Sequence, residues 1–402
     1  MSKPKILLLE SIHPVADALL QDEGFEVLRA DGALREEQLC ERLKGVQLLG
    51  IRSKTQVTRR VLDAAESLIA VGAFCIGTNQ IALEHAMKRG VAVFNAPFSN
   101  TRSVAEMVIA EIVMLSRHLG DRVREMHHGV WKKGASGSRE VRGKTLGVVG
   151  YGHIGSQVSI LAEDLGMKVI FHDTVSKLPL GNSRPVKTLE VLLEESDFVT
   201  LHVPETPQTR GMIGAAQLAR MKKSACLINA SRGTVVDLDA LAQALREKRL
   251  DGAAVDVFPE EPEASSTEGF ETPLRGLSNV ILTPHIGGST AEAQEAIGRE
   301  VSTSLAQFVH GGTTLASVNF PQVDLARTPG TWRLINVHQN VPGVLRDLNR
   351  IVSDREANIH SQVLSTNAAI GYLIMDLDTD VASQVVEDMR RLSTSISART
   401  VA

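Results

Sequence analysis

The chain has 402 residues, of which 43% are hydrophobic and 22% are charged, and its formal net charge is −4. These values are typical of a globular protein with two or three domains, and they exclude a disordered or fibrous chain. The weak negative charge gives no electrostatic footprint for nucleic acid or for an acidic membrane surface. No apolar run approaches the roughly 18 residues of a membrane span. Cys40, Cys75 and Cys226 have neither disulfide nor zinc spacing, so we expect a protein of the reducing cytoplasm.

Residues 1–100 alternate short apolar runs with helical patterns, starting with the run ILLL at residues 6–9. This alternation predicts a parallel sheet that is covered by helices on both faces. Ser103 and Glu106 then have the spacing of a capping box, which predicts a helix over residues 104–119. Because that helix is apolar on nearly all sides, we expect it to be buried, within the fold or between subunits.

A second alternating pattern begins at Thr145 and predicts another doubly wound α/β domain. Its strand-like runs are TLGVVG, KVIFHD, FVTLHV, ACLINA, GAAVDVF and NVILTP. Ser289 is the expected cap of a long helix over residues 290–310, which could return the chain to the first domain.

After a linker (PQVDLARTPGT), the C-terminal patterns follow the order strand, helix, strand, strand, helix, strand. This order predicts a ferredoxin-like βαββαβ domain. The predicted fold is therefore α/β, with two doubly wound parallel-sheet domains and a third, ferredoxin-like one. The predicted limits are 1–100 with 286–320 for the first domain, 101–285 for the second and 328–402 for the third.

The stretch GVVGYGHIGS (147–156) fits the pattern GxGxxG at Gly150, Gly152 and Gly155. The pattern alone is weak, because a plain strand-to-helix turn is also rich in glycine. Here it follows an apolar strand and precedes a helical pattern over 157–165, and the next strand ends in Asp173, 18 residues after Gly155. The constellation predicts a dinucleotide site, with the pyrophosphate at the helix N-terminus. The negative charge of Asp173 favours NAD over NADP.

Three further strand-like runs end in residues with acid–base or anchoring chemistry. Arg232 follows the run 225–230, Glu261 lies in DVFPEEP, and His285 lies in TPHIGG. Each has an ordinary structural alternative, namely a surface salt bridge, a polar loop or a structural histidine. Since open α/β sheets bind ligands at the carboxyl ends of their strands, the three could converge on one crevice.

The segments GYGHIG, LINASRGTVVD, AAVDVFPEEP and LTPHIGGST resemble the D-isomer-specific 2-hydroxyacid dehydrogenases, over about residues 1–320. The resemblance implies that His285 moves the proton of the substrate C2 hydroxyl, that Glu261 holds its other ring nitrogen, and that Arg232 grips the substrate carboxylate. It assigns residues 101–285 to NAD binding. The implied NAD contacts are Gly150, Gly152, His153, Ile154, Gly155, Asp173, Ala230, Ser231, Arg232, Asp256, His285, Gly287 and Gly288.

Within that family, FNAPFSNTRSVAEMVIAEIVML, GIRSKT and CIGTNQ are similar to members that oxidise D-3-phosphoglycerate in the first step of L-serine synthesis. This similarity makes residues 1–100 and 286–320 the substrate-binding domain. The implied substrate contacts are Arg52, Ser53, Lys54, Asn100 and Lys133.

The segment of Trp131 and Lys133 resembles one that reaches a neighbouring subunit's site, and its alternative is a solvated basic loop. Some members have a basic residue where this chain has Asp31, which leaves the number of phosphate contacts open. His127 and His128 would point apart on a helix, so we expect no metal site there.

The C-terminal domain resembles the ACT regulatory domain. His338, Asn340 and Asn358 match positions that hold serine in feedback-inhibited members, which implies serine as the effector. The alternative is that the domain only dimerises. The resemblance also implies a homotetramer that assembles through NAD-domain and ACT-domain contacts. Pro329-Gly330 replaces the glycine pair of the family's hinge, so transmission of inhibition could differ.

Two other functions stay open at this point. One is a D-2-hydroxyacid dehydrogenase with another substrate, such as 2-hydroxyglutarate. The other is a non-enzymatic, NAD-sensing protein that resembles the transcriptional corepressors of the same fold.

Overall fold

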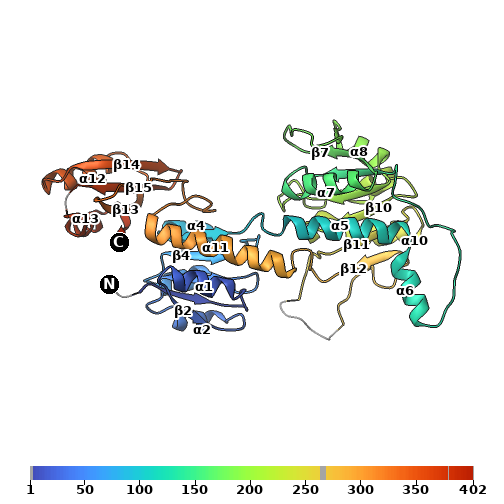
Figure 1. The fold of residues 1–402 in the computed structure, drawn as a ribbon, viewed down its shortest axis with the longest axis horizontal. Helices are drawn as coiled ribbons and strands as arrows, with labels where there is room; N and C mark the ends of the chain where they lie inside the picture. Colours follow the sequence, from blue (N-terminus) through green and yellow to red (C-terminus); the bar gives the residue numbers. More distant parts are fainter. Residues whose placement is uncertain (1–2, 263–268, 379, 402) are drawn as a thin grey trace. The chain divides into compact units, whose positions relative to one another are not determined.

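The computed structural model describes residues 3–262, 269–378 and 380–401 (Figure 1). The chain divides into two compact units: residues 1–99 with 294–402 form unit 1, and residues 100–293 form unit 2. Unit 1 contains a five-stranded and a four-stranded sheet, and unit 2 contains a seven-stranded sheet. The limits of three separate domains stay a prediction. Among the described helices, none is both long and apolar enough to cross a membrane.

The five-stranded sheet of unit 1 is parallel throughout, with the order β2-β1-β3-β4-β5. Its strands are β1 (Lys5–Leu8), β2 (Glu26–Arg29), β3 (Leu48–Ile51), β4 (Ala70–Ala73) and β5 (Ala92–Asn95). Its helices are α1 (Val15–Asp22), α2 (Glu36–Arg42), α3 (Arg59–Ala64), α4 (Leu83–Lys88) and α11 (Ala291–Gly311).

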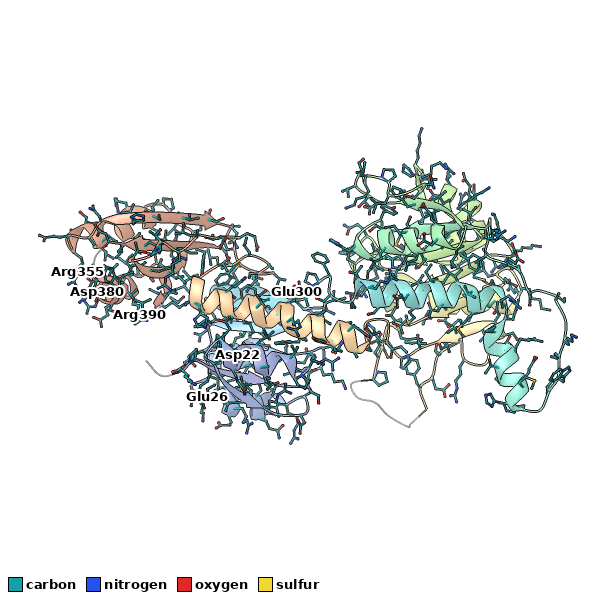
Figure 2. The ribbon with its side chains drawn as sticks, viewed as in Figure 1. Asp22, Glu26, Glu300, Arg355, Asp380 and Arg390 are labelled. Atoms are coloured by element: carbon teal, nitrogen blue, oxygen red, sulfur yellow. The ribbon has the colours of Figure 1, made fainter. Side chains whose placement is uncertain are left out.

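Both faces of this sheet are covered, as the alternating sequence pattern predicts. Successive strand residues point to opposite faces. Ile6 and Leu8 join the core formed with α1 and α11, whereas Leu7 joins the core formed with α2, α3 and α4. Figure 2 shows Glu300 on α11, where its carboxylate accepts a hydrogen bond from Ser99 Oγ.

The sheet of unit 2 is also parallel, with the order β12-β11-β10-β9-β6-β7-β8. The strands are β6 (Thr145–Val149), β7 (Lys168–His172), β8 (Arg184–Pro185), β9 (Phe198–Leu201), β10 (Cys226–Asn229), β11 (Gly252–Val255) and β12 (Val280–Leu282). From β6 the chain adds β7 and β8 on one side and then β9 to β12 on the other, so the strand order reverses between β6 and β9. Dinucleotides bind at such a switch point, outside the carboxyl ends of the strands.

Two helical layers enclose this sheet. The helices of unit 2 are α5 (Thr101–Ser116), α6 (Leu119–His127), α7 (His153–Asp164), α8 (Leu189–Glu195), α9 (Ala215–Arg220), α10 (Leu238–Arg246) and the 3₁₀ helix η1 (Gly233–Val235). One core joins α5 and α7 to the sheet, and another joins α8, α9 and α10 to its opposite face. The doubly wound prediction is confirmed.

The C-terminal sheet is antiparallel, in the order β14-β15-β13-β16. Its elements are β13 (Trp332–Gln339), α12 (Val344–Asp354), β14 (Ile359–Thr366), β15 (Ile370–Leu377), α13 (Ala382–Arg390) and β16 (Ser395–Val401). This is the predicted ferredoxin-like βαββαβ order. One sheet face packs on α12 and α13, and the other, with Ile335 and Tyr372, packs on Leu305 and Phe308 of α11.

Three helix starts differ from the sequence prediction. α5 begins at Thr101 rather than Val104, so Ser103 lies inside the helix and bonds Thr290 Oγ1 instead of capping. That helix ends at Ser116 because His118 adopts a left-handed φ of 51°, and it leaves Val113 38% exposed. The predicted helix over 104–119 therefore exists, but it begins and ends three residues earlier, and Val113 stays exposed on the single chain.

The other two starts shift for local reasons. α11 is capped by Thr290 and not by Ser289, because Thr290 Oγ1 accepts the N–H of Ala293 at 3.2 Å. α7 begins at His153, four residues before the predicted start, and Gly152, in an extended conformation, is its N-cap. The sequence pattern also missed the short edge strand β8.

Candidate active site

The glycine loop joins β6 to α7 with the geometry of a dinucleotide site. Gly150 has a φ of 89°, and a Cβ there would overlap the carbonyl oxygen of His202. A Cβ at Gly155 would overlap the carbonyl oxygen of Gly150, so helix and loop lie in close contact. A Cβ at Gly152 would meet no atom within 4 Å. The space before the first turn of α7, which starts with His153 and Ile154, therefore fits a pyrophosphate.

Asp173 lies beside this loop at the end of β7. Its Oδ2 accepts the N–H of Tyr151 at 2.8 Å, and its Oδ1 accepts the N–H of Val175 at 3.1 Å. Each carboxylate oxygen keeps lone pairs for further donors. The structure thus brings Asp173 and the glycine loop together, at the place expected for an adenosine ribose.

Asp256, which is 2% exposed, organises the loop that carries His285. Its Oδ1 accepts the hydroxyl of Thr283 at 2.6 Å and the N–H of Ile286 at 2.8 Å, and its Oδ2 accepts the N–H of Gly287 at 2.9 Å. Three hydrogen bonds to one carboxylate fix the loop against the end of β11.

His285 and Glu261 form a hydrogen-bonded pair. The distance from His285 Nδ1 to Glu261 Oε2 is 2.7 Å, and Glu261 Oε1 accepts the N–H of Phe258 at 3.0 Å. The hydrogen bond that the His285 ring donates to the Glu261 carboxylate raises the pKa of His285, although burial of the ring opposes the shift. Burial would raise the pKa of Glu261, but the bonds from His285 and Phe258 hold it below its usual value. The pair therefore favours a carboxylate beside an imidazolium.

The backbone of His285 is strained. Its φ is 54°, and its N–H donates to the carbonyl of Asp256 at 2.8 Å. A left-handed non-glycine residue costs about 1–3 kcal/mol and clusters at functional sites. The ring itself is half-exposed, and its bond to Glu261 orients it.

Arg232 follows β10 and belongs to the same group of side chains. Its positive charge acts on the pKa of both Glu261 and His285. Asn229 fixes the turn: its Oδ1 accepts the N–H of Ser231 at 3.1 Å and its Nδ2 donates to the carbonyl of Arg232 at 3.0 Å. Ala230 lies between these residues in the same turn. The three strand ends thus bring Arg232, Glu261 and His285 together.

Glu111 of α5 is a buried acid behind this site. It is 3% exposed, and neither of its carboxylate oxygens has a hydrogen-bond partner among the described residues. Burial, together with the nearby charge of Asp256, raises the pKa of Glu111 to about 8. At neutral pH this side chain is therefore protonated.

Asn100 precedes α5 and packs on Gly288, where a Cβ would overlap its amide nitrogen. Asn100 Oδ1 is buried and has no partner in the described part of the chain. Lys133 lies in the exposed segment after α6, next to Trp131, which is 78% exposed. The structure therefore places Asn100 with the His285 loop, and Lys133 in a separate surface segment.

The GIRSKT loop lies in unit 1, at the end of β3. Buried Glu10 accepts the N–H groups of Lys54 at 3.0 Å and Thr55 at 2.8 Å, and Gln80 Nε2 donates to the carbonyl of Arg52 at 2.7 Å. Ser53 and Lys54 are exposed, so the loop presents polar and cationic side chains on a fixed backbone.

The three residues predicted to bind the effector serine lie at two separate places of the C-terminal sheet. His338 is the second-last residue of β13 and lies opposite Gly371, and Asn340 Nδ2 donates to the carbonyl of Asn367 at 2.7 Å. Asn358 directly precedes β14, whose first residue, Ile359, lies opposite Leu377. Leu377 in turn pairs with Trp332, the first residue of β13. One chain therefore holds His338 and Asn340 together, but Asn358 at the other end of the sheet.

Four supporting residues were missed by sequence reasoning: Glu10, Tyr151, Asn229 and Thr283. Asn229 and Thr283 lie at strand ends, and that position could have indicated them. Glu10 and Tyr151 act through partners that only the fold brings near. Within residues 3–262, 269–378 and 380–401, no three His, Cys, Asp or Glu side chains cluster as metal ligands would.

Two family models match the chain. The NAD binding domain of the D-isomer specific 2-hydroxyacid dehydrogenases matches residues 109–287, and an ACT domain like that of the AHAS small subunit matches residues 334–397. Among solved structures, the NAD complexed form of a D-isomer specific 2-hydroxyacid dehydrogenase from Lactobacillus delbrueckii ssp. bulgaricus is 27% identical, with a TM-score of 0.68. The alignment covers 78% of this chain and 100% of that one.

Curated relatives align with almost the whole chain. The D-3-phosphoglycerate dehydrogenase of Dictyostelium discoideum is 52% identical over 397 residues, which is 99% of this chain and 97% of that protein. The D-3-phosphoglycerate dehydrogenase of Escherichia coli K12 is 51% identical over 400 residues, with the same shares. The chain therefore belongs to the D-isomer specific 2-hydroxyacid dehydrogenase family, in the group of the D-3-phosphoglycerate dehydrogenases.

Proposed function

We propose that this protein oxidises D-3-phosphoglycerate to 3-phosphohydroxypyruvate with NAD, the first step of L-serine biosynthesis. The observation that carries the proposal is the His285–Glu261 pair, 2.7 Å apart and within the electrostatic range of Arg232. It occurs in a chain that is 52% identical to a D-3-phosphoglycerate dehydrogenase over nearly its whole length. A fold alone would not identify the reaction.

In this proposal His285 moves the proton. Glu261 occupies Nδ1, which leaves Nε2 to take the proton of the substrate C2 hydroxyl. The raised pKa of His285 favours the imidazolium that this transfer forms. The planar guanidinium of Arg232 pairs with the substrate carboxylate and holds C2 in place. When bound, NAD supplies the acceptor for the hydride that leaves C2.

The residues of unit 2 fit NAD. Gly150, Gly152 and Gly155 leave room for the pyrophosphate at the start of α7, and Asp173 accepts from the ribose. Asp256 lies at the nicotinamide end, because it is bonded to the loop of His285. The remaining contacts that we propose are His153, Ile154, Ala230, Ser231, Gly287 and Gly288.

We propose Arg52, Ser53 and Lys54 as the phosphate-binding loop of the substrate domain. Its backbone is held by Glu10 and Gln80, so its side chains are available for an anion. Asn100 and Lys133 are the further contacts. The buried, unpaired Oδ1 of Asn100 supports this role for Asn100, since such an atom costs about 1–3 kcal/mol unless a donor reaches it.

The test of the proposed function is a substrate panel. NADH formation should be fastest by far with D-3-phosphoglycerate, compared with D-glycerate, D-lactate and 2-hydroxyglutarate, and NAD should be preferred to NADP. Reduction of 3-phosphohydroxypyruvate checks the reverse direction. A protein that binds NADH but turns over none of these substrates would contradict the proposal and favour a sensing role.

Serine is the effector that we propose for the ACT-like domain. His338, Asn340 and Asn358 together offer donors and acceptors for an amino acid. Because Asn358 lies at the far end of the sheet, the site requires Asn358 from a second copy. This requirement supports an oligomer, for which we propose a tetramer through contacts of the NAD and ACT domains. Among the described residues, Cys40, Cys75 and Cys226 form no disulfide, which suits the reducing cytoplasm that we propose.

A further inference from the structure

Tyr151, the second residue of the glycine loop motif, is buried and holds more than the loop itself. It is 4% exposed, and its ring stacks on Phe171 of β7, with centroids 3.8 Å apart and an interplanar angle of 18°. Phe171 lies two residues before Asp173. The ring thus fixes the end of β7 against the glycine loop.

The phenol hydroxyl of Tyr151 is the centre of a buried polar cluster. Its Oη lies 3.2 Å from Ser159 Oγ and 2.9 Å from Ser183 Oγ, and it accepts the N–H of Leu180 at 3.3 Å. Ser159 is 0% exposed and Ser183 is 7% exposed. Ser183 Oγ donates to the carbonyl of Leu180 at 2.7 Å. One hydroxyl therefore joins α7 to the chain at residues 180–183.

Glu163 of α7 holds the same stretch from its other side. Both of its carboxylate oxygens accept the N–H of Asn182, at 2.9 and 3.0 Å. Gly181 between these anchors has a φ of 60°, and a Cβ there would overlap the Glu163 carboxylate. Residues 180–183 are thus docked on α7 by two independent side chains.

Residues 174–183, which we name the adenosine flap, connect Asp173 to this docking point. Its near end is tied by Asp173, which accepts the N–H of Tyr151 at 2.8 Å, and its far end is tied by the Tyr151 hydroxyl. The middle presents Val175 and Leu178, which are 57% and 82% exposed. A single residue therefore holds both ends of a segment that begins at the proposed ribose contact.

We infer that Tyr151 is a positioning residue for the cofactor, which sets the adenosine flap as a wall beside the adenosine half of NAD. The inference rests on the proposed function, because it takes Asp173 as the ribose contact. The backbone N–H of Tyr151 orients the carboxylate, and its hydroxyl keeps the apolar side chains of the flap in place. Chemistry at C2 lies at the other end of the cofactor, so Tyr151 should act on binding alone.

The experiment is the Tyr151→Phe variant of the full-length protein. It removes only the hydroxyl and keeps the backbone bond to Asp173. One lost hydrogen bond corresponds to about a 2- to 12-fold change in a binding constant. We expect the KM for NAD and the Kd for ADP-ribose to rise by such a factor, while kcat at saturating NAD and the preference for NAD over NADP stay unchanged. Binding of nicotinamide mononucleotide should not change.

The matched control is Tyr372→Phe, since these are the two tyrosines of the chain and both are buried. Tyr372 donates to the carbonyl of Gly312 at 2.7 Å, in the C-terminal part of unit 1. This variant should lose comparable stability but bind ADP-ribose normally. If both variants bind ADP-ribose equally well, or if Tyr151→Phe lowers kcat as much as it raises KM, the inference is wrong.

Ser183→Ala gives a second reading if Tyr151→Phe fails to fold. It removes a flap partner of the hydroxyl and leaves the glycine loop intact, so weaker ADP-ribose binding and faster amide exchange in residues 175–182 are expected. Unchanged binding and exchange would overturn the inference. Neither ADP-ribose binding nor amide exchange needs the substrate, so a wrong proposal for the substrate would appear in the substrate panel and not in these two measurements.

Discussion

Two histidines, His285 in unit 2 and His338 in the C-terminal sheet, occupy proposed sites that are built in different ways. Glu261 bonds His285 and raises its pKa, whereas burial lowers the pKa of His338. The partners of His285 come from neighbouring strand ends of one parallel sheet. Asn358, the predicted partner of His338, lies at the far end of an antiparallel sheet. The first arrangement is complete in one chain and suits proton transfer. The second presents a ring whose pKa is lowered by burial, and we propose that it takes Asn358 from another copy.

The largest effect is expected from His285→Ala, which breaks the first site. Proton transfer contributes about 10²- to 10⁴-fold to such reactions, so kcat with D-3-phosphoglycerate should fall by that factor. NADH binding should survive, because most proposed cofactor contacts lie elsewhere. Steady-state rates and NADH fluorescence check both parts. The control is His360→Ala, an exposed histidine of β14, which should keep full activity. Near-normal turnover of His285→Ala would remove this histidine from the mechanism.

Two buried acids, Asp376 and Glu111, also differ in how they are accommodated. Arg333 and Asp376 in unit 1 are 1% and 0% exposed and form two hydrogen bonds of 2.7 Å, whereas Glu111 in unit 2 has no described partner. The pKa of Glu111 is raised from 4.5 to about 8, so the folded state keeps a proton that the unfolded chain releases. Stability is therefore lost as the pH rises from about 4.5 to 8.

Glu111→Gln tests this difference, because the amide stays neutral at every pH. The variant should be more stable than the parent near pH 7, by about 3 kcal/mol as an order of magnitude, and the gain should shrink near pH 5. Denaturant unfolding of both proteins at the two pH values measures it. A gain that does not depend on pH would mean that Glu111 is ionised in the fold. Asp376→Asn, in contrast, breaks a partnered charge and should destabilise by about 3–5 kcal/mol.

The third prediction addresses whether the proposed serine site of His338, Asn340 and Asn358 combines residues of two chains. Asn340→Ala should weaken serine binding by about 5- to 150-fold and relieve inhibition, with catalysis at low serine unchanged. Asn358→Ala should do the same. Oligomers mixed from the two variants contain some sites with neither change, so they should regain part of the inhibition. Titration of activity with serine and calorimetry measure these effects. If the mixture stays as insensitive as either variant alone, the site does not combine the two chains.

The smallest effect is expected at Asp173, which we propose contacts the adenosine ribose of NAD and not the substrate. Asp173→Ala removes the charge that faces a 2′-phosphate, so NAD should bind about 10-fold more weakly and NADP should be tolerated better. The ratio of kcat/KM for NAD and NADP measures the change. Asp164→Ala, at the end of α7, is a matched removal of one carboxylate. An unchanged ratio at Asp173→Ala would place the ribose contact elsewhere.

Sequence patterns predicted most of this architecture because local spacing determines it. The period of the apolar residues marks strands and helices, and GxGxxG requires the backbone freedom that Gly150 shows at a φ of 89°. Helix starts were harder to predict, because α5 begins after Asn100, which makes no side-chain cap hydrogen bond, and not at the capping pattern of Ser103 and Glu106. The partners of Glu10, Tyr151 and Glu111 are far away in sequence or missing, and no local pattern encodes them. Likewise, only strand register separates Asn358 from His338.

The contact between His338 and Gly371 has an evolutionary consequence. A Cβ at position 371 would overlap the imidazole of His338, in a sheet remote in sequence from the catalytic trio. A single methyl group added at position 371 would therefore displace the His338 ring, which we propose binds serine, and would leave the catalytic residues unchanged. Under the inhibition by serine that we propose, one codon change at Gly371 would release the enzyme from end-product control, in a natural lineage under serine shortage or in a strain selected to overproduce the amino acid.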